Sequence, residues 1–262
     1  MYGFHLKEYD KNIKDLLISK GCTIYQCFKD EYKNCLLYQP ELKPILHGSF
    51  YINLASLNKF STYTLIDEIN FCLNHDINYY VVHMGKCTKK LKIEKKECIL
   101  NMLKTLKYVC KKLKLYENDK FNLCVELLSG ENNDMLYDFR KLYKYFFNKE
   151  YVNHQKKYFK NLKICFDTCH VFASGYNIND IDFFNKLMKF IKKTLKLERI
   201  ALVHFNNSVF KLNERKDQHA DIDNGEISIE SMLYIFQYFI KHKIPLLLEL
   251  KNIKTNINYI TF

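Results

Sequence analysis

The stretch KICFDTCHVFASGYNI, residues 163–178, contains the pattern around which the rest of the chain is organised. Residues 164–166 form a short apolar run, which is typical of a buried strand. A carboxylate and an imidazole, Asp167 and His170, stand at the end of that run, and small residues with Gly175 follow them. A strand that ends in Asp and His and then opens into a loop is typical of a metal site at the mouth of an α/β barrel.

Seven further runs of this kind occur along the chain. They are rich in Val, Ile, Leu, Phe, Tyr and Cys without polar alternation, as in parallel strands that helices cover. The eight predicted strands are 2–6, 23–28, 44–47, 79–83, 122–127, 163–167, 200–205 and 244–250. Helical spacing lies between them at 8–19, 65–75, 95–113, 136–147, 182–197 and 230–241. This alternation predicts an α/β fold, a (β/α)8 TIM barrel, as a single domain over residues 1–262.

The size and composition of the chain agree with this fold. A barrel of this type needs roughly 250 residues, and the chain has 262, of which 48% are hydrophobic, enough to fill a barrel and pack its helices. The net charge of +12 favours a polyanionic partner, although lysine-rich helix faces that contact only solvent would give the same composition.

The cysteines and the apolar runs indicate a compartment. The ten cysteines form no C-x-x-C pair, which favours a reducing, intracellular location; cytoplasm, nucleus and virus particle are not distinguished. The N-terminus is too polar for a signal peptide, and no apolar run approaches the roughly 20 residues of a membrane helix. We therefore expect no membrane association.

Residue types that bind metals stand at the ends of six consecutive predicted strands. Chemistry in such barrels is located at the C-terminal ends of the strands. In order, these residues are His47, His83, Glu126, Asp167 with His170, His204 and Glu249. The loop after His204 adds Asp217 and His219, which are two residues apart and project to the same side of an extended segment.

The number of these residues indicates a metal centre. A single His or Glu at a strand end is more often a hydrogen-bonded structural residue than a ligand. Nine such residues at one rim favour metal binding over separate structural roles, because buried carboxylates and imidazoles are costly unless paired or metal-bound. Five imidazoles and four carboxylates suit two or three ions, with Zn²⁺ favoured and Mn²⁺ or Fe as alternatives.

Two residues near this rim have open roles. His5 ends the first predicted strand, and a part in orienting ligands or contacting phosphate is as plausible as a structural one. Cys169 is a conceivable ligand, although a place in the core is favoured.

These residues resemble those of the endonuclease IV family of apurinic/apyrimidinic (AP) endonucleases. The resemblance covers almost the whole chain. Its most specific segments are FDTCHVFASGYNI (166–178), VHFNNS (203–208) and KDQHADIDNGEI (216–227), and LHGSFYINLAS (46–56) and VVHMG (81–85) are similar to the family's earlier histidine segments. Together and in this order, the motifs are far more specific than any one of them.

The resemblance implies a barrel with three zinc ions. By this resemblance His47 and His83 hold the first ion, Glu126 bridges it to the second, Asp167, His204 and Glu249 complete the second, and His170, Asp217 and His219 hold the third. All nine positions carry the residue type that the family has there.

The resemblance also implies a reaction. The family acts in base excision DNA repair on duplex DNA with an abasic site and cuts the phosphodiester bond on its 5′ side, which leaves a 3′-hydroxyl and a 5′-deoxyribose phosphate. Water activated by the metals would attack the phosphorus, with Glu126 as the catalytic residue that helps to place it. A missing base makes extrusion of the damaged nucleotide less costly. The family further implies trimming of blocked 3′ ends and action as a monomer, and no protein partner is inferred.

The DNA contacts implied by the family lie in two loops. Phe50 falls where the family inserts an aromatic side chain into the minor groove, and Tyr51 is next to it. Tyr32 and Lys33 stand where family members often present Arg. Asn207 replaces the Asp of the family's usual HLND run.

Two alternatives compete with this function. A sugar isomerase or epimerase of the same barrel superfamily would use fewer metals, bound mostly by carboxylates. The third ligand set and the charge of +12 argue against it. A protein that binds DNA without cutting it is disfavoured because all nine ligand types are present.

Overall fold

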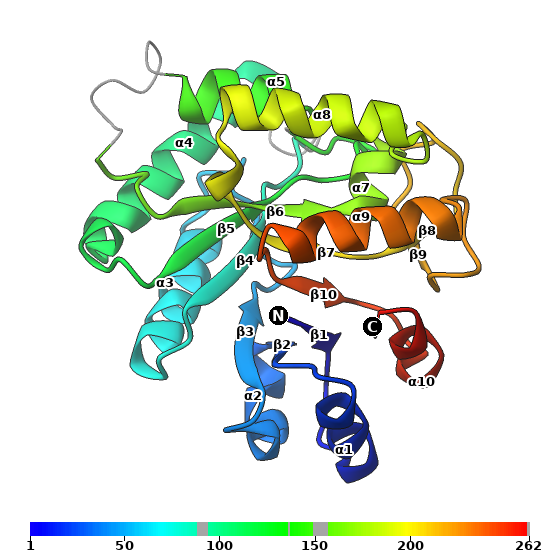
Figure 1. The fold of residues 1–262 in the computed structure, drawn as a ribbon. Coiled ribbons are helices and arrows are strands. Elements are labelled where there is room, and N and C mark those ends of the chain that lie inside the picture. The colour runs from blue at the N-terminus through cyan, green and yellow to red at the C-terminus, as the bar shows by residue number, and fades with distance from the viewer. Residues whose placement is uncertain (88–93, 136, 149–156, 261–262) are drawn as a thin grey trace.

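Eight parallel strands close into a barrel in the computed structural model, which describes residues 1–87, 94–135, 137–148 and 157–260 (Figure 1). Around the barrel the order is β1 (Tyr2–His5), β2 (Ile24–Phe28), β3 (Lys43–His47), β4 (Tyr79–His83), β5 (Asn122–Glu126), β6 (Leu162–Asp167), β7 (Ile200–His204) and β10 (Leu246–Leu248), which pairs again with β1. The predicted (β/α)8 barrel is confirmed, and each predicted strand overlaps an observed one.

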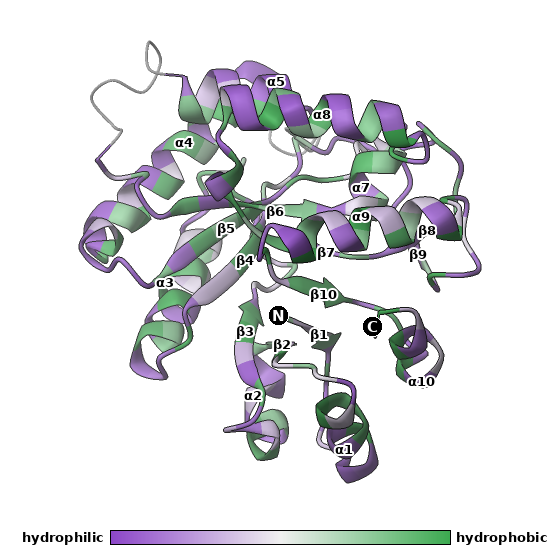
Figure 2. Ribbon diagram, in the orientation of Figure 1, coloured by the Kyte–Doolittle hydropathy of each residue, from purple (hydrophilic) through white to green (hydrophobic). Residues whose placement is uncertain are grey.

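Helices follow the strands and surround the barrel. The longer ones are α1 (Lys11–Ser19), α3 (Lys59–Asn74), α4 (Lys95–Lys112), α8 (Ile181–Thr194) and α9 (Ile229–Lys241). In Figure 2 strands such as β7 and β10 are coloured mainly as hydrophobic, whereas these helices alternate between polar and apolar residues. The helices thus pack one face on the barrel and turn the other to solvent. Within the described ranges, the structure has no helix long and apolar enough to cross a membrane.

Shorter elements fill the connections. They are η1 (Lys29–Glu31), α2 (Tyr32–Cys35), η2 (Leu36–Tyr38), η4 (Leu115–Glu117), α5 (Phe139–Leu142), η5 (Tyr143–Phe147), α7 (Thr168–Ala173), η6 (Leu197–Arg199), α10 (Ile253–Asn256) and η7 (Ile257–Tyr259). A small antiparallel pair, β8 (Asn207–Ser208) with β9 (His219–Ala220), closes a loop after β7.

Two predicted helices begin at other residues, and a third is irregular. The helix expected at 8–19 begins at Lys11, because the Asp10 side chain caps it, and α3 begins at Lys59, after a cap from Asn58. The helix expected at 136–147 is split into α5 and the π-helical turn η5, and its position 136 lies outside the described residues.

The barrel interior is built in layers, because side chains alternate along a strand. Seven strands each place one apolar side chain in a buried cluster: Ile24, Ile45, Val81, Cys124, Cys165, Leu202 and Leu247. β1 contributes Gly3, which pairs with Ile24 on one side and Leu247 on the other. Two residues further along each strand stand His5, Gln26, His47, His83, Glu126, Asp167, His204 and Glu249. An apolar layer therefore lies directly below a polar layer at the C-terminal mouth.

Gly3 gives a first prediction, because a Cβ atom there would lie 1.8 Å from the backbone oxygen of Ile24. That oxygen is fixed by the pairing of β1 with β2. Overpacking typically costs about 1–3 kcal/mol, and a clash with backbone belongs at the upper end. We expect Gly3→Ala to lower the free energy of unfolding by about 3 kcal/mol in urea denaturation. The exposed change Lys7→Ala should stay within about 0.5 kcal/mol of the wild type, and equal midpoints for the two variants would contradict the clash.

Candidate metal centre

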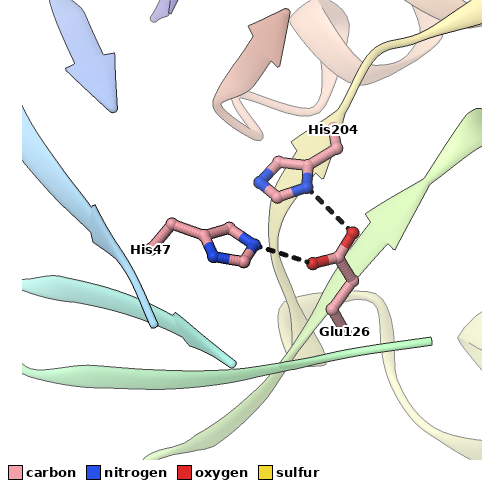
Figure 3. A group of neighbouring side chains, drawn as sticks. All are labelled: His47, Glu126 and His204. Carbon is pink, nitrogen blue, oxygen red and sulfur yellow. Dashed lines mark hydrogen bonds and ion pairs between the residues drawn. The ribbon is translucent and has the colours of Figure 1, made fainter. Parts of the chain in front are cut away.

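Glu126, at the end of β5, lies at the centre of the polar layer, with its side chain only 1% exposed. Its Oε2 atom is 3.3 Å from His47 Nε2 and 3.2 Å from His83 Nε2. Its Oε1 atom is 3.0 Å from His204 Nδ1 and 3.4 Å from His170 Nδ1. Figure 3 shows two of these rings, His47 and His204, pointing at opposite oxygens of the carboxylate. One carboxylate thus joins two sets of imidazoles.

Charges at this centre compensate one another. Burial raises the pKa of Glu126, but the imidazoles of His204 and His83 outweigh it and hold that pKa well below its usual value. Burial lowers the pKa of His204, and the carboxylates of Glu249 and Glu126 reverse this and raise it to about 9. Carboxylates buried among imidazoles need positive charge close by, which protons or divalent cations can supply.

The predicted ligands converge in overlapping groups whose ligand atoms lie within 4.8 Å of one another. The groups are His47, Glu126 and His204; Glu126, Asp167, His204 and Glu249; and His170, Asp217 and His219. The ninth residue, His83, faces the same Glu126 oxygen as His47. A further group, Asp167, Cys169 and His219, was not predicted as a ligand set.

The ring nitrogens fit metal binding. The Nδ1 atoms of His47 and His170 lie 2.8 Å and 2.9 Å from the backbone oxygens of Gly48 and Leu127, so we assign the protons to Nδ1 and the lone pairs to Nε2. His170 Nε2 is buried and makes no hydrogen bond within the described part of the chain, although Asp217 Oδ1 is 3.0 Å away. Metal-binding histidines are held in this way, with the second nitrogen bonded to a carbonyl or carboxylate.

The segment FDTCH places two of these ligands through a helix cap. Asp167 ends β6 and is the N-cap of α7, where its Oδ1 accepts the His170 backbone N–H at 2.7 Å. Its Oδ2 atom faces the other way and lies 3.7 Å from His219 Nε2. The pairing of β8 with β9 brings the loop with Asp217 and His219 back to this point. Burial raises the pKa of Asp217, but His170 outweighs it and holds the pKa below its usual range.

Two amide side chains at the centre were not predicted from the sequence. Gln26 and Asn206 are both fully buried. Asn206 donates from Nδ2 to Asp167 Oδ2 at 2.8 Å and to Glu249 Oε2 at 3.2 Å, and its Oδ1 accepts the Glu249 backbone N–H at 2.9 Å. Strand alternation could have placed Gln26 at the barrel mouth, because it is the inward position two residues after Ile24. It was passed over because an amide is not a usual metal ligand.

The two residues whose roles were open lie beside the centre. His5 Nε2 is 3.4 Å from Glu31 Oε2, and its Nδ1 is 3.9 Å from Glu249 Oε1, so it borders the ligands. Cys169 is buried, its thiol donates to the Gln218 carbonyl at 3.7 Å, and burial raises its pKa to about 12. Cys169 is therefore a buried core residue, and its sulfur also lies within 4.8 Å of ligand atoms of Asp167 and His219.

Three of the four predicted DNA contacts are exposed at the surface. Phe50 and Tyr51 are 70% and 80% exposed, and Lys33 is exposed on α2. The Phe50 ring centroid is 5.6 Å from that of His47 and 5.5 Å from that of His83, so this ring stands over the ligands at the mouth of the barrel.

The fourth predicted contact, Tyr32, is wrong. Tyr32 is only 5% exposed. Its ring packs edge-on against Phe71 and His75 of the α3 segment, with centroids 5.1 Å and 5.3 Å away, and its hydroxyl accepts a hydrogen bond from Gln39. The α2 turn directs this side chain into the core, where DNA cannot reach it.

Comparisons with known proteins identify the family of this chain. The family model described as "Xylose isomerase-like TIM barrel" matches residues 24–257. The protein named "Probable endonuclease 4" from Persephonella marina is 31% identical over 254 residues, which cover 94% of this chain and 78% of that protein.

Solved structures are similar over nearly the whole chain. Endonuclease IV from Thermus thermophilus has a TM-score of 0.71 at 22% identity, with 98% of this chain and 95% of that one covered. A D-tagatose 3-epimerase-like protein has a TM-score of 0.70 at 21% identity, with 98% and 93% covered, so the barrel by itself does not separate endonucleases from epimerases. The sequence match does separate them: the chain belongs to the endonuclease IV family of AP endonucleases.

Proposed function

We propose that this protein is a metal-dependent AP endonuclease of base excision repair. It hydrolyses the phosphodiester bond 5′ to an abasic site in duplex DNA and leaves a 3′-hydroxyl and a 5′-deoxyribose phosphate. The observation that carries the proposal is the convergence of nine carboxylates and imidazoles at one barrel mouth. Trimming of blocked 3′ ends by the same site, and action as a monomer, complete the proposal.

The nine side chains would hold three Zn²⁺ ions, with Mn²⁺ or Fe as possible substitutes. His47, His83 and Glu126 would hold the first, Glu126, Asp167, His204 and Glu249 the second, and His170, Asp217 and His219 the third. When bound, such ions activate water for attack on phosphorus and stabilise charge on the phosphate and the leaving oxygen.

The protein's own residues orient this chemistry. Glu126 faces His47 and His83 with one oxygen and His204 with the other, so it fixes the spacing of two ligand sets. The apolar layer below excludes water from that side. His83 and His219 are each 22% exposed and Asp217 36%, whereas Glu126 is 1% exposed, so a phosphodiester reaches the centre across these three residues.

The exposed aromatic side chains suit a duplex that lacks a base. Phe50 and Tyr51 would wedge into the DNA where stacking is already interrupted, and Lys33 would contact a phosphate. The net charge of +12 adds long-range attraction for the duplex. Extrusion of the abasic nucleotide toward the ligands then costs less than extrusion of an intact one.

The rival function, isomerisation or epimerisation of a sugar, leaves part of this site without a role. One metal held by carboxylates and an imidazole would account for the group around Glu126 and Glu249. A single metal would leave the group of His170, Asp217 and His219 without an ion to bind. Relatedness to a protein named as an endonuclease also favours the nuclease.

Incision of an abasic duplex tests the proposal. Zinc-loaded protein should cut a duplex that carries one tetrahydrofuran abasic mimic on the 5′ side of the lesion, and a matched duplex with an intact base should stay whole. Removal of metal by a chelator should abolish cutting, and Zn²⁺ should restore it. Glu126→Gln should fail to cut even when zinc is supplied. An uncut lesion duplex after incubation with fully metal-loaded protein would overturn the function.

Two variants test the division of ligands. Asp167→Asn keeps the helix cap, since Asn is also a good N-cap, but removes a charged ligand from the second ion, which shares Glu126 with the first. Zinc content should fall from about three ions per chain toward one. His170→Ala should release mainly the third ion and leave about two. Elemental analysis after dialysis measures this, and equal losses in the two variants would count against the division.

The wedge is tested by removing the Phe50 ring. Aromatic stacking on nucleic acid is worth about 1–3 kcal/mol, so Phe50→Ala should weaken binding of abasic duplex on the order of tenfold, measured by fluorescence anisotropy in chelator. Phe60→Ala is a matched control, since Phe60 is 60% exposed on α3 and has no ring contact with the ligands among the described residues. Equal weakening in both variants would show that the Phe50 ring has no special role.

A further inference from the structure

Gln26 on β2 is fully buried in the polar layer and contacts two of the proposed ligands. Its Oε1 atom lies 3.0 Å from His204 Nε2. Its Nε2 atom donates to Glu249 Oε1 at 2.8 Å and lies 3.2 Å from His5 Nδ1. One amide therefore bonds an imidazole and a carboxylate from two other strands, although Gln26 is not itself one of the proposed ligands.

The carboxylate of Glu249 fixes which way this amide points. An ionised carboxylate only accepts hydrogen bonds, so the amide NH₂ must face Glu249. The reversed amide would bring two acceptor oxygens to 2.8 Å, which is repulsive. Glu249 would be ionised in the proposed site, because carboxylates bind metal ions in their deprotonated form.

The amide in turn fixes the proton of His204. Because Gln26 Oε1 is an acceptor, His204 Nε2 must carry a proton and donate it. The other nitrogen, Nδ1, would then be the one that is free to bind a metal ion when it gives up its proton. Nδ1 lies 3.0 Å from Glu126 Oε1 and 3.2 Å from Glu249 Oε2, within the group of side chains that would hold the second ion.

His204 differs in this respect from the other buried histidines of the site. His47 and His170 place a ring nitrogen against a backbone oxygen, which the barrel itself holds in place. His204 depends on a side chain from a strand that supplies no metal ligand. Gln26 also links outward, because its second N–H reaches His5, whose Nε2 faces Glu31.

We propose that Gln26 is a positioning residue for the second ion: it selects the tautomer of His204 that binds metal through Nδ1 and turns Glu249 toward the same ion. The inference rests on the proposed function for its meaning in catalysis, but its effect on metal binding can be measured without DNA. Loss of such a supporting partner typically costs about 10–100-fold in metal affinity or activity.

The test replaces the amide without changing the volume of the side chain. Gln26→Met keeps the shape and removes all three contacts. Asn101→Leu is the matched control, because Asn101 is a buried amide on α4 that donates to the Ala55 carbonyl and makes no hydrogen bond to a proposed ligand among the described residues. Both variants are compared with the wild type in zinc affinity by chelator competition, in ion content, and in thermal unfolding of the metal-free protein.

We expect Gln26→Met to bind one of its zinc ions about 10–100-fold more weakly, while Asn101→Leu keeps wild-type zinc affinity. The kcat of Gln26→Met on abasic duplex should fall by a similar factor at unchanged KM, since a fully buried side chain does not touch DNA. Wild-type zinc affinity in a folded Gln26→Met protein would overturn the proposal, as would an equal loss in Asn101→Leu.

A measurement on the wild type keeps the proposal testable even if Gln26→Met does not fold. In zinc-loaded protein labelled with ¹⁵N-histidine, long-range ¹H–¹⁵N correlation spectra should show His204 protonated at Nε2 and metal-bound at Nδ1. The opposite assignment would overturn it. A protein that gives the expected spectrum and zinc affinities but leaves abasic DNA uncut would refute the nuclease function and leave the role of Gln26 in metal binding intact.

Discussion

The buried carboxylate of Glu126 organises the mouth of this barrel. The side chain is 1% exposed, and an unpaired charge in that position would cost several kcal/mol. Four imidazoles within 3.4 Å of its oxygens compensate that charge, and they come from β3, β4, β7 and the start of α7. Segments far apart in the chain must therefore be held together at one point. A closed barrel holds them there through the hydrogen bonds between its strands.

The alternation of side chains along the strands provides the foundation for this centre. Each strand that carries a polar residue at the mouth has an apolar residue, or Gly3, two positions earlier. The polar layer therefore packs on the apolar layer. Only the third ligand set departs from this scheme. His170 is placed by the Asp167 cap of α7, and Asp217 and His219 by the loop that β8 and β9 close. Asp217 and His219 are partly exposed, at 36% and 22%, whereas His170 of the same set is buried.

The barrel and the clustering of the nine side chains at its mouth could be predicted because their signals are local. Apolar runs without alternation mark parallel strands, and the last inward residue of each run marks the active end. The DNA contact that the family resemblance implied for Tyr32 failed, since the segment KDEYKN (29–34) is polar and gave no sign that one turn of helix would bury the ring against Phe71. Sequence reasoning also missed Gln26 and Asn206, because amides seldom bind metals and their importance lies in which residues they contact.

The order of the strands along the chain, the residue types at their ends and, through its motifs, the family could all be inferred from the amino-acid sequence. These follow from periodicity and spacing over a few residues, which local sterics and burial enforce. The tertiary structure alone shows how closely these side chains approach one another and which amides contact them. Gln26 lies 178 positions before His204 and 223 before Glu249, and nothing local connects them. Closure of the barrel through β1 places β2 and β10 on either side of one strand, and that closure turns a buried glutamine into the partner of two ligands.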